Sequence, residues 1–125
     1  TMNVISTTAA PAAIGPYSQA IEANGTVYVS GQLPIDPATG EFAPGGIQAQ
    51  ARQSLTNMKN ILAEAGLTVQ NVAKVTVLLA DIADFAAVNE VYAEFFSAPF
   101  PARSAFQVAA LPKGAGVEIE AIAVK

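Results

Sequence analysis

The chain has 125 residues, of which 52% are hydrophobic and only 13% are charged, and its formal net charge is −4. This length suits one compact domain over residues 1–125, and the low charge content predicts an oligomer whose interfaces bury surplus apolar surface. The six basic residues are scattered along an acidic chain, so no nucleic-acid partner is expected. Cysteine and histidine are absent, which excludes disulfides, thiolate nucleophiles, histidine triads and zinc sites built on Cys or His.

Neither a membrane span nor a targeting segment is visible in the sequence. No apolar run reaches the length that crosses a bilayer, and the stretch TMNVISTTAAPAAIGP lacks the basic start and the continuous apolar core of a secretory signal. We therefore expect a cytoplasmic protein without a membrane partner.

The first elements predicted along the chain are short strands. Residues 2–6 can form a first strand, and a loop stiffened by prolines follows it. The apolar runs on either side of Asn24 and Gly25 predict a β-hairpin, because the Asn-Gly pair suits the positive φ angles of a tight turn. The second arm of this hairpin is expected to run from Thr26 to Ser30.

Two helices with a strand between them are expected in the middle of the chain. Apolar residues recur every three or four positions over 47–65, which predicts an amphipathic helix that ends at Gly66. The run 73–80 is apolar on both faces, as in a covered central strand. A second helix is expected to begin near Asp81 or Asp84, either of which can cap it. Its apolar side would carry Phe85, Val88, Tyr92 and Phe95.

The closing stretch, PFPARSAFQVAALPKGAGVEIEAIAVK, predicts two more strands over 103–111 and 116–124, joined by a turn at Lys113 and Gly114. The order of the elements predicts an α+β fold with a single mixed β-sheet and two helices packed on one face. The other face carries too many apolar residues to stay in contact with water. Association through this face is therefore expected.

Arg103 and two glutamates are the first candidates for chemistry. Arg103 begins a strand, where its guanidinium can hold a carboxylate through two parallel hydrogen bonds; the alternative is an ion pair at a subunit contact. Glu118 and Glu120 are two residues apart in a strand, so they share a face with the apolar Ile122 and Val124. At the edge of a buried cleft such a carboxylate would have a raised pKa and could act as a general acid or base, whereas ordinary exposed charge is the alternative.

Weaker candidates lie at the boundaries of elements, where binding groups are often placed. Tyr17, in IGPYSQA, is one of them, with a half-buried packing role as its alternative. Ser30 and Gly31 end a strand, and the alternative for Ser30 is a strand-end cap. Asn89 lies on the second helix beside the apolar stripe, where a solvent-facing or rim position is the alternative.

Taken in order, the motifs GPYSQA, SGQLP and PARSA followed by LPKGAGVEIEAIA resemble the Rid family, the reactive intermediate deaminases, and most closely its RidA branch. The resemblance extends over nearly the whole chain. It implies a chorismate-mutase-like subunit, assembled as a homotrimer with three clefts between subunits. It also implies hydrolysis of 2-iminobutanoate, 2-iminopropanoate and similar short 2-imino acids, released by PLP-dependent dehydratases, to 2-oxo acids and ammonia, with no metal or cofactor in the deaminase.

The resemblance also implies a role for each candidate residue. Arg103 would bind the substrate carboxylate, and Glu118 would orient and deprotonate the attacking water. Tyr17 would close over the site as an aromatic lid. Ala105 stands where RidA proteins often have Cys, so its backbone and not a thiol would contact the substrate. The effect of Ala105 and Phe106 on the size of the pocket stays open. The further substrate contacts would be Ser30, Gly31 and Asn89.

Two other functions stay open from the sequence. The same trimeric clefts could hold small carboxylates or hydrophobic segments without chemistry, as in a binding or chaperone-like protein. An endoribonuclease is the third possibility, and the acidic charge and scattered basic residues argue against it.

Overall fold

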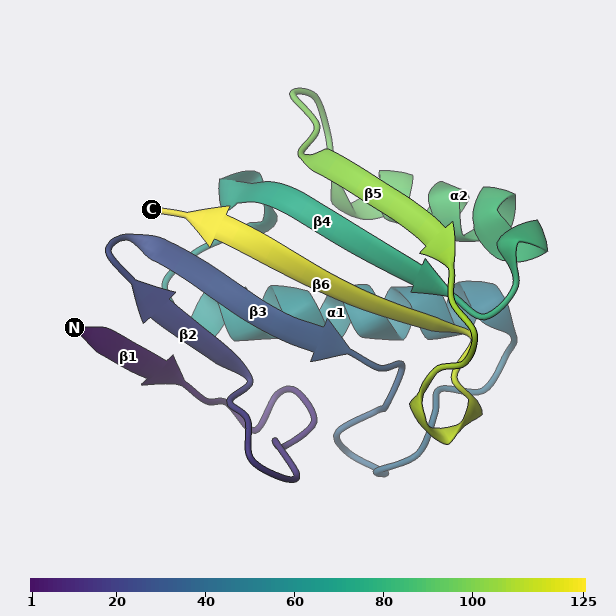
Figure 1. The fold of residues 1–125 in the computed structure, drawn as a ribbon, viewed down its shortest axis with the longest axis horizontal. Coiled ribbons are helices and arrows are strands. Elements are labelled where there is room, and N and C mark those ends of the chain that lie inside the picture. Colours follow the sequence, from purple (N-terminus) through teal and green to yellow (C-terminus); the bar gives the residue numbers. More distant parts are fainter.

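A six-stranded mixed β-sheet with both long helices behind it organises the chain (Figure 1). The computed structural model describes all of residues 1–125. Across the sheet the strand order is β1-β2-β3-β6-β4-β5, and only the β4–β5 pair is parallel. The expected α+β class, with a single mixed sheet and two helices on one face, is confirmed. In chain order the elements are β1 (Met2–Ile5), β2 (Ala20–Ala23), β3 (Thr26–Gln32), α1 (Ile47–Glu64), η1 (Val69–Asn71), β4 (Val72–Leu79), η2 (Ile82–Asp84), α2 (Phe85–Phe95), β5 (Ala102–Gln107), η3 (Pro112–Gly114) and β6 (Val117–Val124).

The hairpin of β2 and β3 turns at Asn24 and Gly25, as predicted. Both residues have positive φ angles, 52° and 80°, which Asn and Gly tolerate better than other residues. Strand β3 continues past the predicted end at Ser30 to Gln32. Between Val29 and Gln32 its pairing with β6 shifts register, so the strand forms a β-bulge there.

The last two strands are not neighbours in the sheet, although a short connection joins them. Strand β5 ends at Gln107 instead of at residue 111, and β4 lies between β5 and β6. Helix α2 carries the chain back so that β5 can pair in parallel with β4, which requires such a crossover. The predicted turn at Lys113 and Gly114 is present, and both residues have positive φ angles.

The core lies between the sheet and the helices. Helix α1 packs on β3 and β6, and its predicted amphipathic pattern is confirmed. Asp81 caps the short helix η2, where its carboxylate accepts from the N–H of Ala83 at 2.9 Å, and α2 follows without a side-chain cap. None of the helices combines the length and the hydropathy that a membrane span requires. The largest fully buried side chains of α1 are Leu55, Met58, Ile61 and Leu62.

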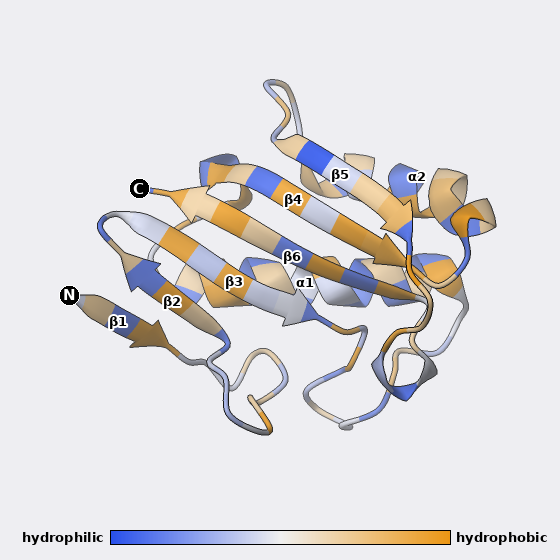
Figure 2. Cartoon of the chain, viewed as in Figure 1, coloured by the Kyte–Doolittle hydropathy of each residue, from blue (hydrophilic) through white to orange (hydrophobic).

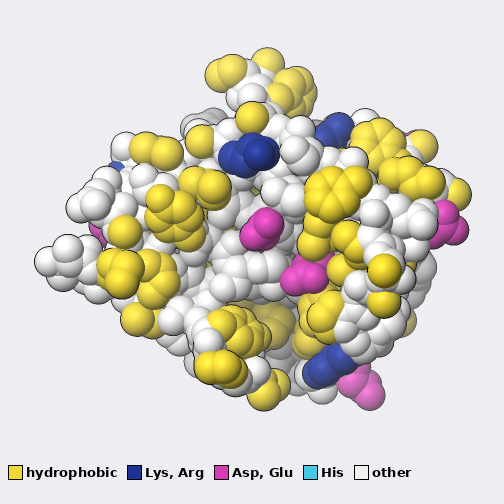
Figure 3. All heavy atoms as spheres, in the orientation of Figure 1, with side chains coloured by type: hydrophobic (Ala, Val, Ile, Leu, Met, Phe, Trp, Pro, Cys, Tyr) yellow, Lys and Arg dark blue, Asp and Glu magenta, His cyan; other side chains and the backbone are white.

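The face of the sheet away from the helices, here called the open face, is rich in apolar side chains. Hydrophobic and acidic residues alternate in the first half of β6, and its second half, from Ala121 to Val124, is hydrophobic throughout (Figure 2). Figure 3 views the open face and shows apolar side chains gathered around a small acidic area. Its exposed large side chains include Tyr28, Phe106, Ile122 and Val124, which are 49%, 47%, 36% and 46% exposed.

Replacing Asn57 of α1 with Ala is expected to destabilise the fold by about 2 kcal/mol. The buried Asn57 amide donates to the carbonyls of Leu33 and Ile35 at 3.2 and 2.8 Å, which anchors the loop after β3. Urea unfolding at one fixed protein concentration measures the change. The control is Asn60→Ala. This change removes a single hydrogen bond, to the carbonyl of Ala9, which is more exposed to solvent, so the loss should be less than about 1 kcal/mol. Equal losses in the two variants would contradict the anchoring role of Asn57.

Candidate active site

Arg103 lies on the edge strand β5, and its guanidinium packs against α2. Its Nη1 donates to Oδ1 of Asn89 at 2.7 Å. The guanidinium carbon lies 4.7 Å from the centre of the Tyr92 ring and 5.3 Å from the centre of the Phe85 ring. The three partners are spaced four and three residues apart, so they share one face of the helix. Helix α2 therefore forms a cradle for the guanidinium from two aromatic rings and one amide.

No carboxylate of the chain neutralises Arg103. The two ion pairs in the structure join Arg52 to Glu94 and Lys125 to Glu22. A guanidinium has five N–H donors in a planar fork, and Asn89 accepts from one of them. The remaining donors and the full positive charge are available to an anion, which is the arrangement that recognises carboxylates.

Glu118 lies on β6, half-buried, with its carboxylate against Gly31 of β3. A Cβ atom at Gly31 would lie 2.8 Å from Cδ of Glu118 and nearer still to Oε2. Only glycine at this position leaves room for the carboxylate as it stands. Burial raises the pKa of Glu118, and the negative charge of Glu120 raises it further.

Ser30 joins the N-terminal loop to the strand that touches Glu118. The Ser30 hydroxyl donates to the carbonyl of Ser18 at 2.5 Å, and the Ser30 N–H donates to the carbonyl of Gln19 at 2.9 Å. Tyr17 directly precedes Ser18 in this loop and is 54% exposed. The loop therefore presents the Tyr17 ring to solvent while its base is held on β3.

Gln19 is a structural residue of this region that the sequence did not single out. Its side chain is buried and bonds to the backbone of the loop before it: Oε1 accepts from the N–H of Thr7 at 2.7 Å, and Nε2 donates to the carbonyl of Pro11 at 2.7 Å. The conformation of the loop that carries Tyr17 depends on these bonds. A glutamine next to two small residues in GPYSQA gives no periodic signal for such a role.

The candidates form two groups on opposite sides of the sheet. Paired residues in neighbouring strands point to the same side of the sheet. Arg103 of β5 pairs with the buried Val75 of β4, so both point to the helix side. Glu118 pairs with Leu78, and Phe106 lies opposite Leu78 on β5, all on the open face. Ala105 is partly buried on the same side as Arg103. One group is thus Arg103, Asn89 and Ala105, and the other is Glu118, Gly31 and Ser30 with the attached Tyr17 loop.

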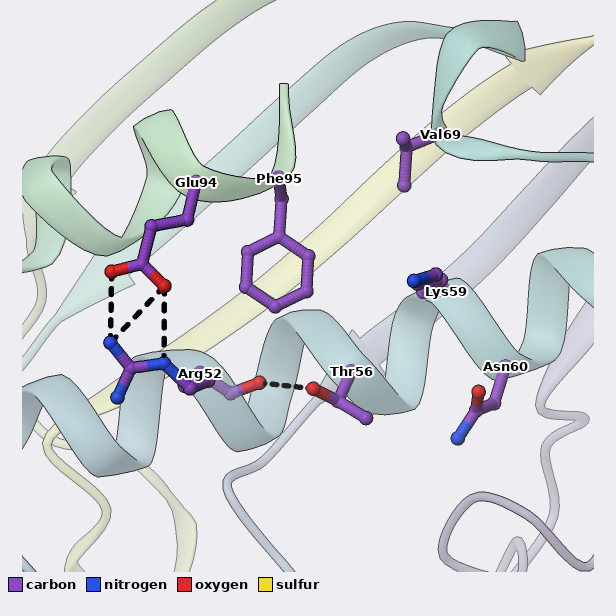
Figure 4. A pocket seen from close by; sticks show the side chains of 7 residues that line it. All are labelled: Arg52, Thr56, Lys59, Asn60, Val69, Glu94 and Phe95. Carbon is purple, nitrogen blue, oxygen red and sulfur yellow. Dashed lines mark hydrogen bonds and ion pairs between the residues drawn. The ribbon is translucent and has the colours of Figure 1, made fainter. Parts of the chain in front are cut away.

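A shallow pocket of about 390 Å³ between the helices contains none of the candidates (Figure 4). At one end of this pocket Arg52 pairs with both carboxylate oxygens of Glu94, at 2.9 and 3.2 Å for Nη2. That arginine, unlike Arg103, is neutralised within the chain. The residues that line this pocket are Arg52, Thr56, Lys59, Asn60, Val69, Glu94 and Phe95.

Comparison with known proteins identifies the family. Residues 7–125 match the family model described as endoribonuclease L-PSP. A Yersinia pestis structure described as a protein of unknown function of the conserved Rid protein family, YyfA, has a TM-score of 0.97 and 48% identity, with 100% of both chains covered. This chain belongs to the Rid family. The predicted resemblance is confirmed by this membership.

Other Rid-family relatives carry more specific names. A Capra hircus protein named 2-iminobutanoate/2-iminopropanoate deaminase is 62% identical over 122 residues, which cover 98% of this chain and 89% of the relative. The structure of E. coli TdcF with bound serine has a TM-score of 0.94 and 50% identity and covers 98% of both chains. The likeness therefore extends over sequence and fold together.

Replacing Glu120 with Gln is expected to lower the pKa of Glu118, because it removes the neighbouring charge that opposes ionisation. NMR of the Glu118 carboxyl carbon during an acid-to-neutral titration measures the shift. Glu64→Gln, at the exposed end of α1, is the control and should change nothing. A Glu118 pKa that is the same with and without Glu120 would contradict the electrostatic coupling.

The same titration has a consequence for stability. The folded-state pKa of Glu118 is raised above its unfolded value, so ionised Glu118 opposes folding. This free-energy cost has its full size above the folded-state pKa of Glu118. It disappears as the pH falls from that pKa to the lower pKa of Glu118 in the unfolded chain. Glu118→Gln should therefore remove part of the pH dependence of unfolding in that window.

Proposed function

We propose that this protein is an imine/enamine deaminase, which hydrolyses 2-iminobutanoate, 2-iminopropanoate and similar short 2-imino acids to 2-oxo acids and ammonia. The observation that carries the proposal is the Arg103 guanidinium, which is held in a cradle with no carboxylate partner in the chain. A 2-imino acid supplies the missing carboxylate. Membership of the Rid family and the name of the goat relative support this choice of substrate.

The chemistry requires one anchor and one proton carrier. Arg103 binds the substrate carboxylate, and Glu118 takes a proton from a water that attacks the C=N carbon. The C–O bond forms as the C=N bond becomes a single bond, and Glu118 passes the water proton to the nitrogen, which gives the aminoalcohol. When the aminoalcohol collapses to the 2-oxo acid, Glu118 takes the hydroxyl proton, the C=O bond forms as the C–N bond breaks, and Glu118 gives this proton to the nitrogen, so that ammonia leaves with both protons of the water. The raised pKa of Glu118 suits the proton-accepting steps of this cycle, since a carboxylate of higher pKa is a stronger base.

The proposed site lies between two subunits of a homotrimer. Arg103 and Glu118 face opposite sides of the sheet in one chain, so a cleft that uses both takes them from different chains. The apolar open face supports association, because such a surface is costly in water. Residues 1–125 would act as one Rid-type domain, and its cytoplasmic location stays a prediction. The substrate contacts would be Arg103, Asn89 and the Ala105 backbone from one subunit, and Tyr17, Ser30 and Gly31 beside Glu118 from its neighbour.

A second candidate is a protein that binds small carboxylates without turnover. The bound serine in the related TdcF structure favours it, because serine carries a carboxylate and no imine. The description of the family model, endoribonuclease L-PSP, raises ribonuclease activity as a third. A net charge of −4 makes RNA a poor ligand for this chain.

Hydrolysis of freshly generated 2-iminopropanoate and 2-iminobutanoate tests the proposal, scored by loss of imine trapped with semicarbazide. Arg103→Ala should lower kcat/KM at least about 100-fold, because two charge-assisted hydrogen bonds to the substrate are lost. Arg52→Ala is the matched control, since it removes the other arginine and should leave the rate within about twofold. No acceleration by the folded wild-type protein would favour the binding protein, and an equal loss in both variants would contradict the role of Arg103.

Mixing two inactive variants tests the location of the site. Arg103→Ala and Glu118→Gln subunits, combined at equal amounts by co-refolding, should recover about a quarter of wild-type activity, because a cleft has both intact residues with probability one half times one half. Arg103→Ala mixed with the double variant is the control and should stay inactive. Recovery no greater than in that control, or a monomer in sedimentation, would contradict a site between subunits.

A further inference from the structure

We propose that Tyr92 is a positioning residue for the proposed reaction, and that it holds Arg103 through its aromatic ring and not through its hydroxyl. This inference rests on the proposed function of Arg103. The observation behind it is the short distance of 4.7 Å between the guanidinium carbon and the centre of the Tyr92 ring. Phe85 contributes a second ring at 5.3 Å, on the same face of α2.

The Tyr92 ring is itself fixed in the core. Tyr92 is 5% exposed, and its ring lies 4.6 Å from the ring of Phe96 at an interplanar angle of 33°. A ring that is packed in this way cannot rotate out from beneath the guanidinium without disturbing the end of α2. It is therefore a rigid support for a long side chain that leaves an edge strand.

An aromatic support suits an arginine that must bind an anion. A carboxylate partner would hold Arg103 equally well, but it would occupy the guanidinium donors and neutralise the charge that attracts the substrate. A ring face attracts the cation through its quadrupole and accepts none of the in-plane N–H groups. Together with the single neutral bond to Asn89, the rings fix the guanidinium and leave its charge available.

The hydroxyl of Tyr92 has no comparable role in the chain. It is buried and forms no hydrogen bond there. Burial raises the pKa of Tyr92, an effect that the nearby charge of Arg103 opposes, so the group stays a neutral phenol near neutral pH. Phenylalanine at this position would keep the supporting ring and remove only the hydroxyl.

Arginine NMR tests the positioning without any assay of activity. The chain has two arginines, so a spectrum of side-chain Nε–Hε groups contains Arg103 and an internal reference, Arg52. Ring currents should move the Arg103 side-chain protons upfield of those of Arg52. Tyr92→Phe should keep this shift, Tyr92→Leu should lose most of it, and the Arg52 signal should stay unchanged in both.

Kinetics tests the consequence for substrate binding. Tyr92→Leu should raise KM about tenfold and change kcat less than about twofold, whereas Tyr92→Phe should match the wild type in both. Tyr92→Met, which fills the space with a flexible side chain and no ring, replaces the leucine variant if that variant does not fold as the wild type does in circular dichroism.

The outcomes separate the two proposals. If the wild type does not hydrolyse imines but the NMR pattern is as expected, the proposed function fails and the positioning role stands. The positioning role is overturned if the ring-free variant keeps the Arg103 shift, or if Tyr92→Phe is as defective as the ring-free variant. A fall in kcat with unchanged KM would also overturn it, because Tyr92 would then affect the chemical step.

Discussion

The central position of β6 is the constraint on which the rest of the structure depends. Its inner residues pack beneath α1, and Val117 and Ile119 have no exposed surface. Because side chains alternate along a strand, burying these residues forces Glu118 and Glu120 to the open face. Packing of the hydrophobic core thus fixes the direction of the one carboxylate that touches Gly31. A shift of β6 by one residue would exchange these two sets of side chains, so the core and the carboxylate depend on the same register.

Strand β5 completes the arrangement from the other side of β4. Its parallel pairing directs Arg103 to the helix side, where α2 offers rings and an amide instead of a carboxylate. Within one chain the Arg103 guanidinium and the Glu118 carboxylate therefore lie on opposite sides of the sheet. Arg103 lacks a negative partner, and Glu118 has a raised pKa because burial and Glu120 oppose its charge. Neither charge is neutralised by an ion pair within the chain, which is typical of residues arranged for binding or catalysis.

The contrast between the two arginines illustrates this point. Arg52 bonds to both oxygens of Glu94 between α1 and α2, which ties the two helices together at the protein surface. Arg103 lies on the same side of the sheet and meets Tyr92 and Asn89 instead. An arginine whose charge is neutralised contributes to structure, whereas one that rests on neutral groups keeps its affinity for anions.

The sequence by itself determined the local features and their faces. The turn at Asn24 and Gly25, the amphipathic helix α1 and the shared face of Glu118 and Glu120 all follow from short-range backbone preferences and periodicity. The tertiary structure decided the rest, because it depends on contacts between residues far apart in the chain. Strand β5 pairs with β4 and not with β6, and the bulge between Val29 and Gln32 arises only against β6. The support of Arg103 likewise needs α2 to dock beside β5, which no local pattern in either segment specifies.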